Sequence, residues 1–264
     1  LVAGVSGVVG LAAAKAFAAD PAWEVVGLSR RRPHGLGSIP HLSVDLADAS
    51  ATAAAIAQHP DITTLVYAAL FEKPGLIPGW FEQDQMETNL AMFRNLMDPL
   101  QATAAGLEHI VLLQGTKAYG AHVAPMRIPG RERAPRHQHA NFYWLQEDDL
   151  RERQAAGGNR WSWSIMRPQI IFGEALGSNM NAIPALGVYA ALLKERGEPL
   201  HWPGGAAMVS EAVDADLLGR SIKWASTSPA GRNETFNVTN GDVFCIKHLW
   251  PAIADAFGME VGED

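Results

Sequence analysis

The first ten residues constrain the fold of this chain more than any other stretch. An apolar run leads into Gly4, Gly7 and Gly10, and an alanine-rich segment follows from residue 11 to 17. This pattern predicts a buried strand, a tight glycine turn and a helix, the arrangement that binds the pyrophosphate of a dinucleotide. Glycines are needed there because a Cβ would block both the backbone angles and the close approach of the phosphates. The spacing is GxxGxxG rather than GxGxxG, so a glycine turn that binds nothing is the alternative.

A second predicted strand, residues 23–29, ends at Ser29 and is followed by Arg30 and Arg31. In dinucleotide-binding folds an acidic residue near this point binds the ribose of NAD, whereas arginine accommodates the additional phosphate of NADP. No acidic residue stands here, and the alternative is a solvated basic turn. The sequence therefore predicts NADPH as the cofactor.

Further strands are predicted at residues 42–46, 64–70, 109–115 and 161–168, with helices at 49–58, at 83–105 and from Asn141 onward. Asp45, at the end of one strand, is expected either to contact the adenine or to cap the next helix. Ala68 and Ala69 are small enough for close passage of a cofactor. The strand at 109–115 carries Lys117 to the sheet edge where ligands bind, unless Lys117 is a surface lysine.

The length of 264 residues and the hydrophobic content of 48% fit one large α/β domain with a small addition. We expect a Rossmann-like doubly wound parallel sheet in residues 1–173. Residues 174–264 are expected to form a mixed region that covers the substrate and is interleaved with the main domain. This region holds predicted helices at 180–194, 214–225 and 246–257 and a strand at 234–238. Because the chain starts inside a strand and its last residues finish no obvious unit, we expect a piece of a longer protein.

Charge and cysteine content exclude several classes of function. The net charge is −7 and the longest basic run is 30–32, which argues against nucleic-acid binding. A single cysteine rules out an internal disulfide and suits the cytoplasm. No apolar run is long enough for a membrane span, and no signal peptide is evident. His122, His137 and His139 lack metal-ligand spacing and are interpreted as loop residues, so no metal site is expected.

Several motifs together resemble one group of the short-chain dehydrogenase/reductase superfamily, the progesterone 5β-reductase and iridoid synthase-like enzymes. The motifs span nearly the whole chain. They are GVSGVVG at 4–10, SRR at 29–31, LQGTK at 113–117, NFY at 141–143, RPQIIFG at 167–173 and NGDVF at 240–244.

The resemblance implies that Tyr143 and Lys117 are the catalytic pair. Most short-chain dehydrogenases carry Tyr-x-x-x-Lys on one helix, but Glu147 stands four residues after Tyr143. In the resembled group the tyrosine lies in the Asn-Phe-Tyr segment and the lysine in Gly-Thr-Lys. Tyr143 is then expected to donate a hydrogen bond to a developing enolate, and Lys117 to orient the cofactor and make the phenol a better acid. Tyr119 is the rival tyrosine.

The activity implied by the resemblance is NADPH-dependent reduction of the C=C bond of an α,β-unsaturated carbonyl compound. The alternatives are a carbonyl reductase, a sugar-nucleotide epimerase or dehydratase of the same fold, and an NADP-sensing protein without turnover. A homodimer is an open alternative to a monomer. The resemblance also implies that Ile170, Ile171 and Ser178 belong to the cofactor site. For Ile170 and Ile171 the alternative is plain packing in the core. The residues expected to contact the cofactor are Gly4, Ser6, Gly7, Val8, Val9, Gly10, Ser29, Arg30, Arg31, Asp45, Leu46, Ala68, Ala69, Gln114, Ile170, Ile171 and Ser178.

Overall fold

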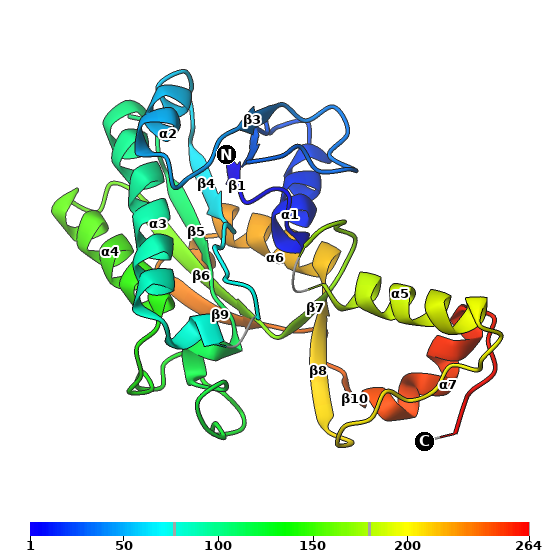
Figure 1. The fold of residues 1–264 in the computed structure, drawn as a ribbon. Coiled ribbons are helices and arrows are strands. Elements are labelled where there is room, and N and C mark those ends of the chain that lie inside the picture. Colours follow the sequence, from blue (N-terminus) through cyan, green and yellow to red (C-terminus); the bar gives the residue numbers. More distant parts are fainter. Residues whose placement is uncertain (76–77, 179–180, 264) are drawn as a thin grey trace.

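A seven-stranded parallel sheet forms the centre of the molecule (Figure 1). The computed structural model describes residues 1–75, 78–178 and 181–263. The strand order is β3-β2-β1-β4-β5-β6-β9, and every neighbouring pair is parallel. The predicted Rossmann-like doubly wound sheet is confirmed. The strands are β1 (Val2–Ala3), β2 (Gly27–Ser29), β3 (His41–Ser43), β4 (Thr64–Tyr67), β5 (His109–Leu113), β6 (Ser162–Pro168) and β9 (Glu234–Val238).

Helices cover both faces of this sheet, which explains why its central strands are continuous apolar runs rather than alternating ones. One face carries α1 (Val8–Ala18) and α6 (Ala215–Thr227). The other carries α2 (Ala49–Ile56), α3 (Gln83–Thr103) and α4 (Phe142–Ala156) (Figure 1). Each layer has its own core. Phe93 and Leu96 of α3 belong to one core, and Phe17 of α1 and Ile222 of α6 belong to the other.

A smaller lobe lies beside the main sheet (Figure 1). Its sheet has the order β10-β8-β7, where β7 (Ile170–Phe172) and β8 (Val209–Asp214) are parallel and β10 (Val243–Cys245) is antiparallel to β8. The helices α5 (Ala182–Glu195) and α7 (Ile246–Ala256) pack around the buried Trp250. Short 3-10 turns are η1 (Pro78–Phe81), η2 (Thr116–Tyr119) and η3 (Pro229–Gly231). Because α6 and β9 return to the main sheet, the chain after residue 173 contributes to both parts.

Strand boundaries differ most from the predictions. The strand expected at 23–29 pairs only over Gly27–Ser29, because its neighbours β1 and β3 are themselves only two and three residues long. The strand expected at 42–46 ends at Ser43, since a turn in which Asp48 N donates to Asp45 O (2.9 Å) follows it. The strands predicted to reach residues 70 and 115 end at Tyr67 and Leu113.

The helix expected at 11–17 begins three residues earlier, at Val8, because the helix already starts within the glycine motif. The other helix predictions agree with the structure to within two residues at the ends that it describes. The helix predicted at 180–194 is described from Ala182, while its predicted first residue, Met180, lies outside the described residues. Within the described ranges, no helix combines the length and the apolar character needed to cross a bilayer.

Candidate active site

The order in which strands are added to the sheet reverses at β1: β2 and β3 lie on one side of it, and β4 lies on the other side. Ligands of open α/β sheets bind at the carboxyl ends of the strands beside such a reversal. Here β1 runs into the glycine turn, where Gly4 has φ +84° and a Cβ on it would lie 2.6 Å from the backbone of Ala68. A Cβ on Gly10 would lie 2.2 Å from Gly4 O. The turn therefore brings the glycines against Ala68 and Ala69 in a cradle that larger residues would fill.

The N-terminus of α1 is open toward this cradle. Its N-cap residue is Gly7, and no side chain among the described residues caps the helix. The first-turn N–H groups of Val8, Val9 and Gly10 have no acceptor within a helix that begins there, so they are free to bind an anion. The arrangement fits the pyrophosphate of a dinucleotide.

The arginines after β2 occupy different positions. Arg31 Nη2 donates to Leu176 O (3.2 Å) and Gly177 O (2.9 Å), which places it beside Ser178. Lys15 of α1 pairs with Glu174 at 3.3 Å. The segment 174–178 is thus attached to both α1 and the end of β2, and Arg31 is bonded to the backbone directly before Ser178. Arg30 is exposed, and its side chain forms no hydrogen bond or ion pair with the described residues.

Several predicted cofactor residues use their side chains within the protein. Ser29 Oγ donates to Arg31 O at 2.8 Å, and the side chain of Leu46 lies in the core. Gln114 Nε2 donates to Glu147 at 3.0 Å, while its oxygen accepts from Arg167 at 2.8 Å. The contacts of Ser29, Leu46 and Gln114 with a cofactor stay predictions.

Asp45 is exposed, and its carboxylate accepts from Ala47 N at 3.0 Å. The alternative that Asp45 caps the following helix is wrong, because Asp48 is the N-cap and accepts from Ala51 N at 2.9 Å. The cap thus stands directly before the first helical residue. The contact between Asp45 and adenine stays a prediction.

Asn141 joins the two segments that carry the candidate catalytic residues. As the N-cap of α4 it accepts from Tyr143 N at 3.0 Å. Its amide donates to Lys117 O at 3.0 Å. The Tyr143 hydroxyl reaches back over β5 and lies 3.6 Å from the position that a Cβ on Gly115 would take. One buried side chain therefore fixes the start of α4 against η2.

Tyr143 and Lys117 also meet at Trp80, a residue that belongs to none of the sequence motifs. Lys117 Nζ lies 4.0 Å from the Trp80 ring centroid. The rings of Tyr143 and Trp80 are 5.2 Å apart and nearly perpendicular. Trp80 Nε1 donates to Glu72 Oε1 at 2.8 Å. Glu72 and Trp80 lie on the segment after β4, where the sequence has no periodicity and a site residue gives no signal.

Burial controls the protonation of both candidate residues. Burial raises the pKa of Tyr143 above its usual value, and the charge of Glu72 raises it further. Burial lowers the pKa of Lys117, and Glu72 opposes that shift. The expected acidifying effect of Lys117 on Tyr143 is therefore outweighed. A phenol with a raised pKa remains protonated and can donate a hydrogen bond.

The three loop histidines come together beside this site. His137 Nδ1 and His139 Nδ1 are 2.9 Å apart, and the rings of His122 and His139 are 5.1 Å apart. Burial, with the charges of His139 and Lys117, lowers the pKa of His122 to about 4, so it is neutral near pH 7. Across the described residues, no three His, Cys, Asp or Glu side chains are placed to hold a metal ion.

Glu147, which replaces the lysine of the usual Tyr-x-x-x-Lys pair, is buried in an ionic network. It contacts Arg167 at 3.4 Å, Arg136 at 3.1 Å and Arg151 at 2.9 Å. Burial alone would raise its pKa, but the hydrogen bond from Gln114 and the charges of Arg136 and Arg151 lower it below its usual value. The rival tyrosine is also engaged, since Tyr119 Oη donates to Asn237 Oδ1 at 2.7 Å. Glu147 and Tyr119 therefore stabilise contacts between elements of the fold.

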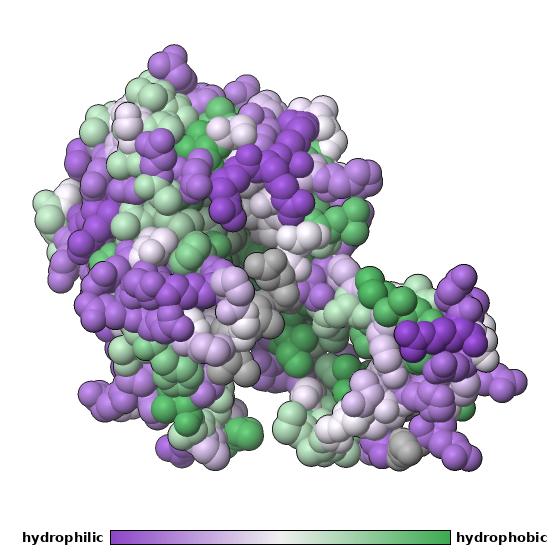
Figure 2. Space-filling view, in the orientation of Figure 1, coloured by the Kyte–Doolittle hydropathy of each residue, from purple (hydrophilic) through white to green (hydrophobic). Residues whose placement is uncertain are grey.

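Ile170 and Ile171 lie on β7, beyond the end of β6. Ile170 is exposed, whereas Ile171 packs against Val8 and Ala12 of α1. The structure brings Ile171 to the glycine cradle, while the contact of both backbones with a cofactor stays a prediction. In the space-filling view, the surface is hollowed between the main body and the lobe of α5 and α7, and hydrophobic residues are exposed there (Figure 2).

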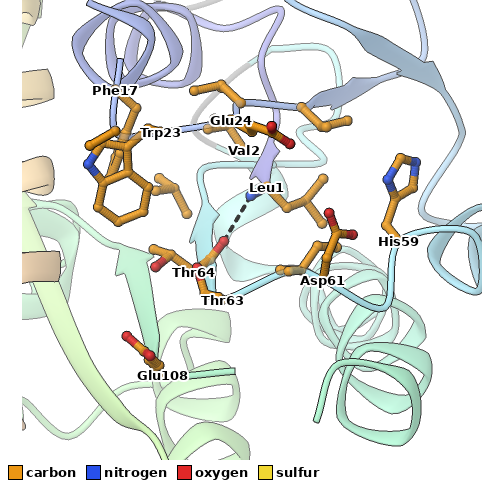
Figure 3. A pocket seen from close by; sticks show the side chains of 15 residues that line it. Leu1, Val2, Phe17, Trp23, Glu24, His59, Asp61, Thr63, Thr64 and Glu108 are labelled. Atoms are coloured by element: carbon orange, nitrogen blue, oxygen red, sulfur yellow. Dashed lines mark hydrogen bonds between the residues drawn. The ribbon is translucent and has the colours of Figure 1, made fainter. Parts of the chain in front are cut away.

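A cavity of about 400 Å³ lies at the opposite edge of the sheet, lined by Leu1, His59, Asp61, Thr64 and Glu108 (Figure 3). The amino group of Leu1 donates to Thr64 O there at 2.8 Å. This edge holds the amino ends of β4 and β5, away from the glycine turn and Tyr143. Because ligands of parallel sheets bind at the carboxyl ends, the cavity is separate from the candidate active site.

Comparisons with known proteins agree with this fold and these motifs. The family described as PRISE-like Rossmann-fold domain matches residues 48–263. The chain is 34% identical over 277 residues to (S)-8-oxocitronellyl enol synthase of Antirrhinum majus, covering 98% of this chain and 69% of that protein. It is 34% identical over 278 residues to 3-oxo-Delta(4,5)-steroid 5-beta-reductase of Arabidopsis thaliana, with the same coverage.

Among solved structures, UDP-glucose 4-epimerase of Thermus thermophilus in complex with NAD is similar, with a TM-score of 0.75 and 20% identity. The match covers 98% of this chain and 84% of the epimerase. At this identity the likeness concerns the fold. The match to the family and the identity with two of its enzymes over nearly the whole chain go further: this chain belongs to the family of PRISE-like Rossmann-fold proteins.

Proposed function

We propose that this protein is an NADPH-dependent reductase of the C=C bond in α,β-unsaturated carbonyl compounds. The observation that carries the proposal is the convergence of Tyr143 and Lys117, from different elements, on the ring of Trp80 at the carboxyl edge of the sheet. The family supports it, since one relative is named a steroid 5-beta-reductase.

The glycine cradle and the open N-terminus of α1 fit a dinucleotide. In this proposal Arg30 and Arg31 contact the phosphate that distinguishes NADPH from NADH, because both follow β2 at the position that reads this part of the cofactor. Asp45 and Leu46 lie toward the adenine, and Ile170, Ile171 and Ser178 toward the nicotinamide end. The remaining contacts are assigned to Gly4, Ser6, Gly7, Val8, Val9, Gly10, Ser29, Ala68, Ala69 and Gln114.

The chemistry of the chain's own residues follows from their environment. Bound NADPH would supply the hydride that the β-carbon of the substrate receives. The C=C bond is then replaced by an enolate, whose negative charge develops on the carbonyl oxygen, and the protonated Tyr143 hydroxyl donates a hydrogen bond to that oxygen. A proton from solvent water adds to the α-carbon and gives the saturated carbonyl compound. One such donor contributes on the order of 10²–10³ in rate. Lys117 orients the ribose, and the buried Trp80 ring excludes water from one side.

The lobe of β7, β8, β10, α5 and α7 is proposed to cover the substrate, and the hydrophobic hollow beside it suits an apolar carbon skeleton (Figure 2). The division into a cofactor domain, 1–173, and a covering region, 174–264, is proposed with two adjustments: β7 belongs to the sheet of the lobe, and α6 and β9 belong to the main body. Epimerase chemistry is less favoured because Glu147, paired with Arg167, occupies the position of the lysine in Tyr-x-x-x-Lys.

The Tyr143→Phe variant tests the proposal. With a simple cyclic enone and NADPH, we expect kcat to fall by roughly 10²–10³ while the Kd for NADPH, measured by fluorescence, stays unchanged. Tyr119→Phe is the matched control and should retain activity, because the Tyr119 hydroxyl is bonded to Asn237. Full activity in Tyr143→Phe would overturn the assignment.

Product analysis with enones, enals and saturated ketones separates C=C from C=O reduction. Conversion of an enone to the saturated ketone supports the proposal, whereas its conversion to an allylic alcohol indicates a carbonyl reductase. NADPH binding without turnover of any compound would indicate a sensor.

A further inference from the structure

The segment after β4 is fixed to α3 on both sides of Glu72. Phe71 N donates to Asn89 Oδ1 at 2.9 Å, and Asn89 Nδ2 donates back to Phe71 O at 2.8 Å. Lys73 N donates to Gln85 Oε1 at 2.8 Å. Asn89 and Gln85 are fully buried. The backbone around Glu72 is therefore held rigidly at the edge of the site.

One indole connects this carboxylate to the catalytic lysine. Trp80 is 1% exposed, donates its N–H to Glu72, and receives the Lys117 ammonium on its ring. A hydrogen bond from an indole N–H to a carboxylate shifts electron density into the ring, which strengthens a cation–π contact on its face. Glu72 thus supports Lys117 both through Trp80 and through its own charge.

We propose that Glu72 is a positioning residue of the catalytic site: its carboxylate, held by the Trp80 indole, is the counter-charge that keeps the Lys117 ammonium against Trp80 and beside Tyr143. This inference rests on the proposed function for its role in catalysis. The Glu72–Trp80–Lys117 arrangement itself can be tested without turnover.

Removing the negative charge of Glu72 should shift the pKa values of Lys117 and Tyr143 in a known direction. Burial lowers the pKa of Lys117 and raises that of Tyr143, while Glu72 raises both. Loss of the negative charge therefore lowers the pKa of both groups. Either deprotonation ends activity at high pH, so the alkaline limb of the rate profile must move to lower pH.

The other groups that face Lys117 do not reverse this sign. His122 has a pKa of about 4, and burial lowers the pKa of His139, so both are neutral across the alkaline limb. Lys73, the neighbour of Glu72, is paired with Glu82 and Asp84.

The Glu72→Gln variant removes the charge and keeps an oxygen that can accept from Trp80 Nε1. We expect the alkaline limb of kcat/KM to move down by about 0.5–1 pH unit. Glu87→Gln is the matched control, because Glu87 is an exposed carboxylate on α3 bonded to Gln83. Its profile should equal that of the unmodified protein.

A second readout needs no activity. After ¹³C-dimethylation, the NMR signal of Lys117, assigned by its loss in Lys117→Arg, should titrate at lower pH in Glu72→Gln than in the unmodified protein. An unchanged Lys117 titration overturns the inference even if the enzyme reduces enones. A shifted titration in a protein that reduces no enone upholds the arrangement and contradicts only the proposed function. If Glu72→Gln fails to fold, Trp80→Phe, which frees the carboxylate from the indole, must shift the same signal, and no shift overturns the inference.

Discussion

Adjacent residues of one basic turn have different roles in the structure. The Arg31 guanidinium is bonded to the backbone at 176–177, and Arg32 Nη2 donates to Gly37 O at 2.7 Å and Ile39 O at 3.1 Å. The Arg30 carbonyl accepts from Ser43 Oγ at 2.8 Å, but its guanidinium forms no hydrogen bond or ion pair with the described residues. The sequence motif treats Arg30 and Arg31 as equivalent, but only Arg30 has its whole guanidinium available.

Arg30→Ala is therefore expected to lose most of the preference for NADPH. A hydrogen bond to a charged group contributes about 1.5–3 kcal/mol, so the KM for NADPH should rise roughly 10–100-fold while that for NADH stays nearly constant. Steady-state kinetics with both cofactors measure this ratio. Arg32→Ala is the control, since its contacts are internal to the turn. An equal change for NADPH and NADH in Arg30→Ala would contradict the prediction.

At the scale of elements, the N-terminus of α4 does more to position the candidate catalytic residues than the amphipathic pattern of the helix does. Asn141 caps this helix and also bonds Lys117 O, so one side chain sets the distance between two segments 24 residues apart. Asp48 caps α2 with a similar hydrogen bond but contacts no candidate catalytic residue. The two caps therefore allow stability and catalysis to be separated.

Asn141→Ala and Asp48→Ala should each lose about 0.5–2 kcal/mol of unfolding free energy. Only Asn141→Ala should also lower kcat, by about 10–100-fold, because small displacements of catalytic groups cost that much. Urea unfolding and enone reduction measure the two effects. A comparable loss of kcat in Asp48→Ala would show that catalysis merely follows stability.

At the scale of the whole molecule, residues 174–264 are joined to residues 1–173 by close contact between α1 and α6. A Cβ on Gly219 of α6 would lie 2.7 Å from Ala12 O in α1. Gly187 of α5 has open space at the same position. Both glycines lie inside helices, so their helix propensities are matched.

Gly219→Ala should lower the melting temperature by about 2–6 °C, because overpacking costs about 1–3 kcal/mol and outweighs the gain in helix propensity. Gly187→Ala should raise it by up to about 3 °C, since only the propensity term applies. Calorimetry on both variants measures the difference in sign. Stabilisation by Gly219→Ala would mean that α1 and α6 separate easily.

The secondary structure was largely predictable because helices and buried strands depend on local periodicity. The helices α2, α3 and α6 were predicted to within two residues at each end, and β9 was predicted with its observed bounds. The ends of β2 and β3 were not, because a strand ends where its partner does. The partner is set by sheet order rather than by neighbouring residues.

The sequence by itself determined the glycine turn, the parallel sheet and the segments that carry Tyr143 and Lys117, since each depends on backbone geometry or a short motif. Only the tertiary structure brought Glu72, Trp80 and Asn141 to the same place and left Arg30 free while binding Arg31. Most of these contacts join residues far apart in the chain, and their energies depend on burial and distance. No local pattern records burial or distance between remote segments, so the environment of the site could be determined only from the folded chain.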